Sequence, residues 1–237
     1  MNKGLRLKAK DPRTPSGLAV HEEMIGPVWS GHAATRALIK AYFQGCSLFV
    51  AAGGSYAGKT AGILVGLYII AQKVPGIKIS ISGLSLTQLK GDAIEFFDEI
   101  VYGSPTPFTH NKTAHRYTFA DGSVIQFRAL DSPKKARGPK QDITYFVEAN
   151  LLPKETWEQA SIRTRKMMVG CFNPTEKFWL VNEKYQADDP RHIFKRYTYD
   201  HNPFTPPKVA EELEGYSETN ENLFRVYRKG LWGVNGL

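Results

Sequence analysis

The chain has 237 residues, of which 42% are hydrophobic, and it carries a formal net charge of +8. This composition excludes a disordered protein, and the longest apolar stretch, residues 63–71, is too short to span a bilayer. The basic first residues do not lead into the apolar region of a signal peptide, and Cys46 and Cys171 provide neither a disulfide framework nor metal-ligand spacing. We therefore expect a soluble, intracellular protein without a membrane partner, whose positive charge favours a polyanion such as nucleic acid.

The predicted elements alternate between helices and strands. Residues 1–25 are polar and contain prolines, which indicates an N-terminal arm. In chain order, the patterns then predict a helix over 35–43, a strand over 47–52, a helix over 61–73, a strand over 76–82, a helix over 86–101, a hairpin of 116–119 and 123–129, a basic loop over 132–141, a strand over 143–147, a helix over 154–165, strands over 166–172 and 193–199, and two polar helices over 207–215 and 218–230. Such alternation predicts an α/β fold, with a mostly parallel sheet flanked by helices on both faces.

The strongest motif lies between the first predicted strand and the helix that follows it. Its residues fit the phosphate-binding P-loop, G-x-x-x-x-G-K-[ST]: Gly53-Gly54-Ser55-Tyr56-Ala57-Gly58-Lys59-Thr60. The glycines allow a tight turn whose N–H groups converge on phosphates, Lys59 would reach the β- and γ-phosphates, and the Thr60 hydroxyl would bind Mg²⁺. The sequence therefore predicts a site for ATP with Mg²⁺.

An acid stands at the end of a later buried strand. Glu148 follows the apolar run 143–147, where parallel sheets collect their ligands. P-loop ATPases with a catalytic glutamate carry an Asp directly before it, but here that position is Val147. Either Glu148 is the catalytic base, or it is the acid on the Mg²⁺ side and the base lies elsewhere; Mg²⁺ tolerates few protein ligands. A surface glutamate that opens a loop is the less favoured alternative.

Asn173 ends another predicted strand and precedes Pro174. An amide at a strand end can contact a γ-phosphate or the attacking water, and a plain Asx-turn is an equal alternative.

Together these segments resemble the ATPase domain of a bacteriophage terminase large subunit, the motor that packs DNA into procapsids. The resemblance covers about residues 45–233 and rests on the ordered set of the P-loop, 84–90, Asp121-Gly122-Ser123, 127–131, Lys135-Ala136-Arg137-Gly138, Phe146-Val147-Glu148-Ala149-Asn150, Phe172-Asn173-Pro174 and 227–233. It implies a P-loop NTPase fold of the RecA-like branch with the catalytic glutamate (ASCE). The expected divisions are an arm over 1–25, an ATPase core over 26–200 and a small helical linker subdomain over 201–237.

The resemblance also implies roles and partners. Lys59 and Thr60 would be the Walker A pair, Glu148 the catalytic glutamate and Asn173 part of the coupling motif. Arg137 would enter a neighbouring subunit's site, although a solvated basic loop explains it nearly as well, and Arg128 and Arg163 are weaker candidates. Double-stranded DNA, a pentameric ring, the portal of the procapsid and the small terminase subunit would be the partners, in the cytoplasm of the infected host. No nuclease activity is expected from this chain.

Other functions stay open at this point. A P-loop phosphotransferase would require an arginine-rich lid that the sequence does not show. A nucleotide-binding assembly module without turnover would be consistent with Val147, and a superfamily helicase would need a second ATPase core. The residues that contact adenine are not indicated, and Pro27, Trp29 and Tyr42 are candidates only by their position.

Overall fold

The computed structural model describes residues 32–185 and 189–234. The predicted N-terminal arm over 1–25, together with Pro27 and Trp29, lies outside the described residues. Among the described residues, no helix is both long and apolar enough to cross a membrane.

The centre of the molecule is an eight-stranded sheet with the order β3-β4-β5-β2-β6-β7-β1-β8. Its strands are β1 (Leu48–Gly53), β2 (Lys78–Gly83), β3 (Phe108–Asn111), β4 (Arg116–Phe119), β5 (Val124–Ala129), β6 (Gln141–Phe146), β7 (Thr164–Phe172) and β8 (His192–Tyr197). All neighbours from β5 to β8 are parallel, and only the β3-β4-β5 meander is antiparallel. The mostly parallel α/β fold predicted from the sequence is therefore confirmed.

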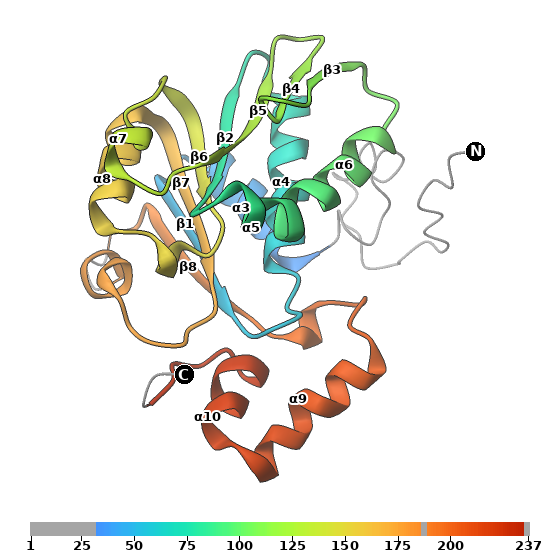
Figure 1. Ribbon diagram of the computed structural model, residues 1–237, viewed down its shortest axis with the longest axis vertical. Coiled ribbons are helices and arrows are strands. Elements are labelled where there is room, and N and C mark those ends of the chain that lie inside the picture. Colours follow the sequence, from blue (N-terminus) through green and yellow to red (C-terminus); the bar gives the residue numbers. More distant parts are fainter. Residues whose placement is uncertain (1–31, 186–188, 235–237) are drawn as a thin grey trace.

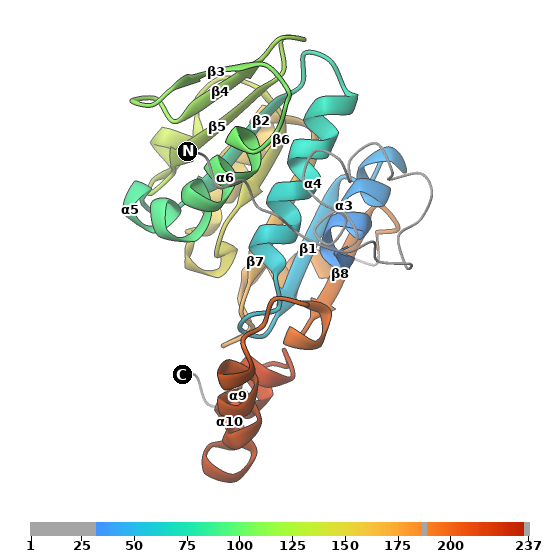
Figure 2. The ribbon, with the colours of Figure 1, turned by 90° about the vertical axis from the view of Figure 1, so that its right-hand side faces the viewer.

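Helices cover both faces of the sheet, as Figures 1 and 2 show. One face carries α3 (Ala33–Phe43), α4 (Lys59–Lys73), α5 (Leu86–Leu89) and α6 (Glu95–Tyr102), and the other carries the single turn α7 (Pro133–Ala136) and α8 (Lys154–Arg163). Helix α4 is almost entirely buried from Gly62 to Ala71, which explains why its sequence is apolar on all sides. This packing fixes the N-terminus of α4 at the carboxyl end of β1.

Three local predictions were incomplete. The helix expected over 86–101 is interrupted by a π-helical turn, Lys90–Ile94, and the basic loop over 132–141 contains α7. Strand β3 was not predicted because it has only four residues, of which the last three, Thr109 to Asn111, are all polar. It is formed by tertiary contacts, among them the stacking of His110 on Tyr117 with ring centroids 4.1 Å apart.

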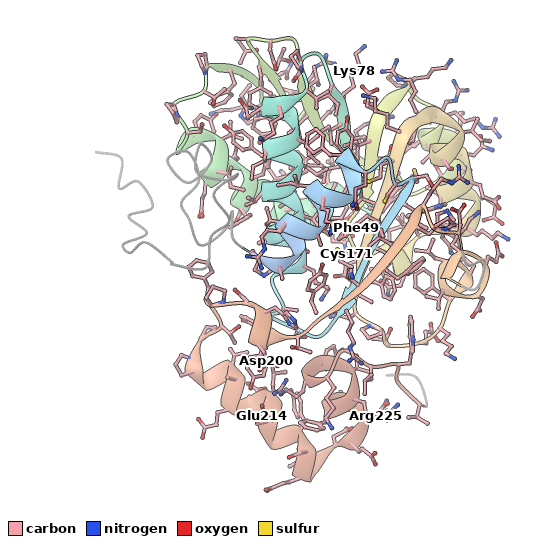
Figure 3. All side chains as sticks on the ribbon, turned by 180° about the vertical axis from the view of Figure 1, so that it is seen from behind. Phe49, Lys78, Cys171, Asp200, Glu214 and Arg225 are labelled. Atoms are coloured by element: carbon pink, nitrogen blue, oxygen red, sulfur yellow. The ribbon has the colours of Figure 1, made fainter. Side chains whose placement is uncertain are left out.

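Beyond β8 the chain leaves the sheet and forms α9 (Pro207–Thr219), α10 (Glu221–Leu223) and a π-helical turn, Phe224–Arg228. These helices gather beside the turn that joins β1 to α4 (Figure 1). Arg228 joins this π-helical turn to α9 and to the turn that follows β8, because its guanidinium contacts Glu214 at 2.6 Å and Asp200 at 2.8 Å. Figure 3 shows Asp200 where the chain leaves the sheet and Glu214 on α9.

Candidate nucleotide-binding site

The P-loop is the turn between β1 and α4, and its glycines are required for two different reasons. Gly58, the N-cap of α4, has a φ of 70°, in the left-handed region that favours glycine. Gly53 and Gly54 instead allow close approach: a Cβ on Gly53 would lie 2.0 Å from the Tyr197 carbonyl oxygen, and a Cβ on Gly54 would lie 2.0 Å from that of Tyr227. The second reason depends on distant parts of the chain and is not visible in the motif.

Lys59 is the first residue of α4 and is only 7% exposed. Its Nζ donates hydrogen bonds to the Gly53 carbonyl at 3.0 Å, the Gly54 carbonyl at 2.7 Å and Asn173 Oδ1 at 2.8 Å. Burial lowers the pKa of Lys59, and the charge of Glu148 opposes this shift. The lysine is thus held in place at the N-terminus of a helix, where backbone N–H groups favour an anion.

Asn173 reaches Lys59 because β7 is the immediate neighbour of β1. The register pairs Ala52 with Phe172, so that Gly53 and Asn173 both follow at the same edge of the sheet. In the structure the Asn173 side chain accepts from Lys59. Its expected contact with a γ-phosphate or the attacking water stays a prediction.

Glu148 lies just beyond β6 and has an unusual backbone conformation. Its φ is 52° and its ψ is 59°, a left-handed geometry that is costly for a residue with a long side chain. Strain of this kind is concentrated at functional sites. Val147 before it is 1% exposed and belongs to the core cluster under α4, so this position directs a methyl group, not a carboxylate, into the protein.

Two polar side chains that the sequence analysis missed lie beneath Thr60. Tyr145 and Cys171 are fully buried, and the Tyr145 hydroxyl is 3.0 Å from Cys171 Sγ, which in turn is 3.7 Å from Thr60 Oγ1. Burial raises the pKa of both Tyr145 and Cys171, so both are neutral at pH 7. The signal in the sequence was Tyr145 itself, since a buried tyrosine hydroxyl requires a partner.

His32, at the N-terminus of α3, packs against the P-loop and the start of α4. It caps α3, where its Nδ1 accepts a hydrogen bond from the Ala34 N–H at 3.2 Å, and it is 3% exposed. A Cβ on Gly58 would lie 2.6 Å from its Nε2, and one on Gly62 would lie 2.5 Å from its Nδ1. Burial lowers the pKa of His32 to about 4, so that the imidazole packed against the loop is neutral.

The part of the chain that follows β8 contacts the P-loop backbone directly. The Ser55 N–H donates to the Tyr227 carbonyl at 3.0 Å, and the Tyr56 carbonyl accepts from Asn202 Nδ2 at 2.7 Å. The P-loop belongs to the predicted ATPase core over 26–200, but its backbone is also held by residues beyond the predicted boundary near residue 200.

The candidate arginines do not join this cluster. Arg137 is exposed and directly follows α7, which packs on α8. Arg128 is half-buried and donates to the Lys135 carbonyl at 3.2 Å, so it braces the basic loop. Tyr42 lies near the C-terminal end of α3, the opposite end from His32, and its hydroxyl accepts from Lys166 Nζ at 3.2 Å. Tyr42 therefore does not reach the phosphate-binding turn.

The donor set fits a nucleotide with Mg²⁺ better than a protein-enclosed metal. Among the described residues, no group of three or more His, Cys, Asp or Glu side chains could hold a metal ion. A P-loop requires no such group, because Mg²⁺ takes one or two protein oxygens and completes its shell with phosphate and water. The Thr60 hydroxyl at the start of α4 meets that requirement.

Comparison with known proteins gives consistent matches. A family model described as phage terminase large subunit matches residues 101–231. The PBSX phage terminase large subunit of Bacillus subtilis (strain 168) is 28% identical over 145 residues, which covers 50% of this chain and 34% of that protein.

Solved structures show the same fold. The large terminase of a thermophilic bacteriophage, in complex with ADP, matches with a TM-score of 0.71 and 17% identity over 86% of this chain and 54% of that one. The ATPase domain of the Thermus phage P74-26 large terminase matches with a TM-score of 0.65 and 16% identity over 94% of this chain and 100% of that one. The chain thus spans about a third of the PBSX protein and about half of the ADP-bound terminase.

Proposed function

Because the chain belongs to the phage terminase large subunit family, we propose that it is the ATP-hydrolysing motor domain that couples hydrolysis to translocation of double-stranded DNA into a procapsid. The observation that carries this proposal is the contact between the P-loop lysine and Asn173 beside the strained Glu148. The large terminase of the thermophilic bacteriophage has been solved with ADP and with ATP-γ-S, which supports a nucleotide at the same fold position here.

In this proposal each residue has a defined task. Residues 53–60 surround the phosphates, and Lys59 exchanges its carbonyl partners for the β- and γ-phosphates. Glu148 orients and polarises the attacking water, while Asn173 links the loss of the γ-phosphate to β7. Thr60 would hold Mg²⁺, and Glu148 would be the second protein ligand if it is not the catalytic base. When bound, Mg²⁺ would neutralise charge on the phosphates.

The partners are part of the proposal. Arg137 is exposed and lies outside its own subunit's site, as a residue acting on a neighbour in a ring would. We infer a homo-oligomeric ring, pentameric by analogy with the family, that engages the portal of the procapsid and the small terminase subunit. Basic loops would contact DNA phosphates, so binding should lack sequence preference and weaken steeply with salt.

An assembly module that binds nucleotide without turnover is the second candidate. Val147 favours it, because no carboxylate at this position can assist Thr60 at the metal. Phosphate release separates the two candidates, since both bind ATP and only the motor hydrolyses it.

The test is steady-state phosphate release from ATP, with and without double-stranded DNA, for the parent chain and Glu148→Gln. The motor proposal predicts release that rises with DNA and falls at least about 100-fold in the variant, in line with the loss of a catalytic base. Lys59→Ala should abolish ATP binding, and Glu176→Gln, an exposed acid outside the site, is the matched control.

Absence of release at high protein concentration, where a ring can form, would contradict the motor proposal if Lys59-dependent ATP binding persists. That result would favour the assembly module.

A further inference from the structure

A cavity of about 540 Å³ opens next to the P-loop, on the opposite face of the sheet from α4. It is bordered by the ends of β1, β7 and β8, by the chain after β7 and by the C-terminal segment that returns to the sheet. Its lining residues are Ala52, Phe172, Pro174, Lys177, Val181, Asn182, Phe194, Lys195, Arg196, Gly230, Leu231 and Trp232. The volume is within the range of small-molecule sites.

Aromatic rings form the floor of this cavity. Trp232 stacks on Phe172 with centroids 5.7 Å apart and planes 27° apart, and Phe194 contributes a further ring from β8. The neighbouring backbone fixes the indole: the Gly233 N–H donates to the Pro174 carbonyl at 3.0 Å. Phe194 and Trp232 are only partly buried, so ring surface remains open to a ligand.

The charged residues of the lining are all cations. Lys177, Lys195 and Arg196 are exposed, and none of them forms an ion pair with a carboxylate of the described residues. Asn182 adds an amide that can both donate and accept. A concave site with ring surface, an amide and unneutralised cations matches a flat aromatic base that carries a phosphate.

We propose that this cavity binds one nucleotide unit, with its base against Trp232 and Phe194 and its phosphate at Arg196 and Lys177. The unit can be a free nucleotide or an unpaired nucleotide of a strand, because both present the same base and phosphate. This site is separate from the phosphate site of Lys59, since the sheet lies between the cavity and α4.

The cavity and the P-loop nevertheless share backbone. Ala52 directly precedes Gly53, and Pro174 directly follows Asn173. On the C-terminal side, a Cβ on Gly230 would lie 2.9 Å from Gly53 Cα and 3.0 Å from the Gly54 nitrogen. A ligand that orders the segment from Gly230 to Trp232 therefore also restrains the first two residues of the P-loop.

The experiment uses the full chain with Lys59→Ala, so that the P-loop contributes little. The probes are a fluorescein-labelled dT12 oligonucleotide and free dTMP or AMP. The test variant adds Lys177→Gln and Arg196→Gln, and the control variant adds Lys90→Gln and Lys112→Gln, two exposed lysines far from the cavity. Both variants lose two charges, which equalises the general electrostatic attraction.

We expect the cavity variant to bind dT12 at least about 10-fold more weakly than the control variant. Saturating probe should also quench part of the tryptophan fluorescence, and this quenching should be absent in Trp232→Phe. Binding of dTMP or AMP with the same dependence assigns the source as free nucleotide, and binding of dT12 alone assigns it to a strand. Equal weakening in the two variants, quenching that persists in Trp232→Phe, or absence of binding by every probe would overturn the proposal.

Discussion

Lys59 Nζ and Asn173 Oδ1 are 2.8 Å apart, so the lysine that a P-loop presents to phosphates is held by a side chain from the end of a different strand. The amide oxygen is a neutral acceptor, and it can release the ammonium group when a phosphate arrives. A carboxylate at the same place would not be neutral, and it would compete with the phosphates for Lys59.

Asn173→Asp should therefore weaken ATP binding by at least about 10-fold, because an ion pair would retain Lys59. Asn173→Ala should leave binding within about 3-fold of the parent chain and reduce phosphate release more than binding. Calorimetric titration with ATP-γ-S measures the first effect, and steady-state kinetics measure the second. Equal ATP affinity in the Asp and Ala variants would contradict the proposed competition.

Gly62→Ala should destabilise the protein although alanine is the better helix former. The added Cβ would lie 2.5 Å from His32 Nδ1 and 3.0 Å from Ala34 Cβ, and overpacking of this kind costs about 1–3 kcal/mol. Gly215→Ala in α9, where no atom lies within 4 Å of the added Cβ, is the matched control and should stabilise by about 0.5–1 kcal/mol. Urea unfolding measures both.

The cause of that loss can be isolated by a second substitution. In a His32→Ala background the imidazole is absent, so Gly62→Ala should cost at least about 1 kcal/mol less than in the parent chain. An unchanged cost would show that Ala34, and not His32, excludes a larger residue at position 62.

His32 should also make stability depend on pH. Its pKa is about 4 in the folded protein and 6.5 ordinarily, so the unfolded chain binds a proton at a higher pH than the folded protein does. The free energy of unfolding should accordingly fall by up to about 3 kcal/mol as the pH is lowered from the ordinary pKa to the folded-state pKa. His32→Asn keeps an N-cap acceptor without a titrating group, and its unfolding should lose this component of the pH dependence. Parallel pH profiles of the two proteins would refute the assignment.

Glu148→Asn should show that strain and function coincide at one residue. Asparagine tolerates the left-handed backbone better than glutamine does, so Glu148→Asn should be about 0.5–1 kcal/mol more stable than Glu148→Gln. Both variants should lack phosphate release. Thermal unfolding of the two variants side by side gives the difference, and a less stable Asn variant would argue against backbone strain at this position.

Much of the fold could be predicted from the sequence because its signals are local. The all-round apolar sequence of α4, the Asp121-Gly122 hairpin and the P-loop between a strand and a helix each depend on neighbouring residues. The parallel orientation of the central strands followed from their alternation with helices.

The site was less accessible because several of its contacts are long-range. Nothing near position 32 in the sequence shows that an imidazole packs on Gly58 and Gly62. The contact of Cys171 with Tyr145 requires β7 to lie beside β6, which pattern alone does not give. The catalytic roles of Glu148 and Asn173 stay predictions that the experiments above address, and the role of Arg137 stays a prediction as well.

The return of the chain to Gly53 and Gly54 has a consequence for biosynthesis. The first half of the P-loop packs against the carbonyls of Tyr197 and Tyr227, which leave the ribosome long after the loop itself. A nascent chain that has emerged only as far as β8 contains all the strands of the described sheet but lacks Tyr227, the acceptor for the Ser55 N–H. Closing a contact over so much sequence is slow. The nucleotide site is therefore among the last parts of this molecule to mature, and an incompletely translated chain would not yet have the finished site.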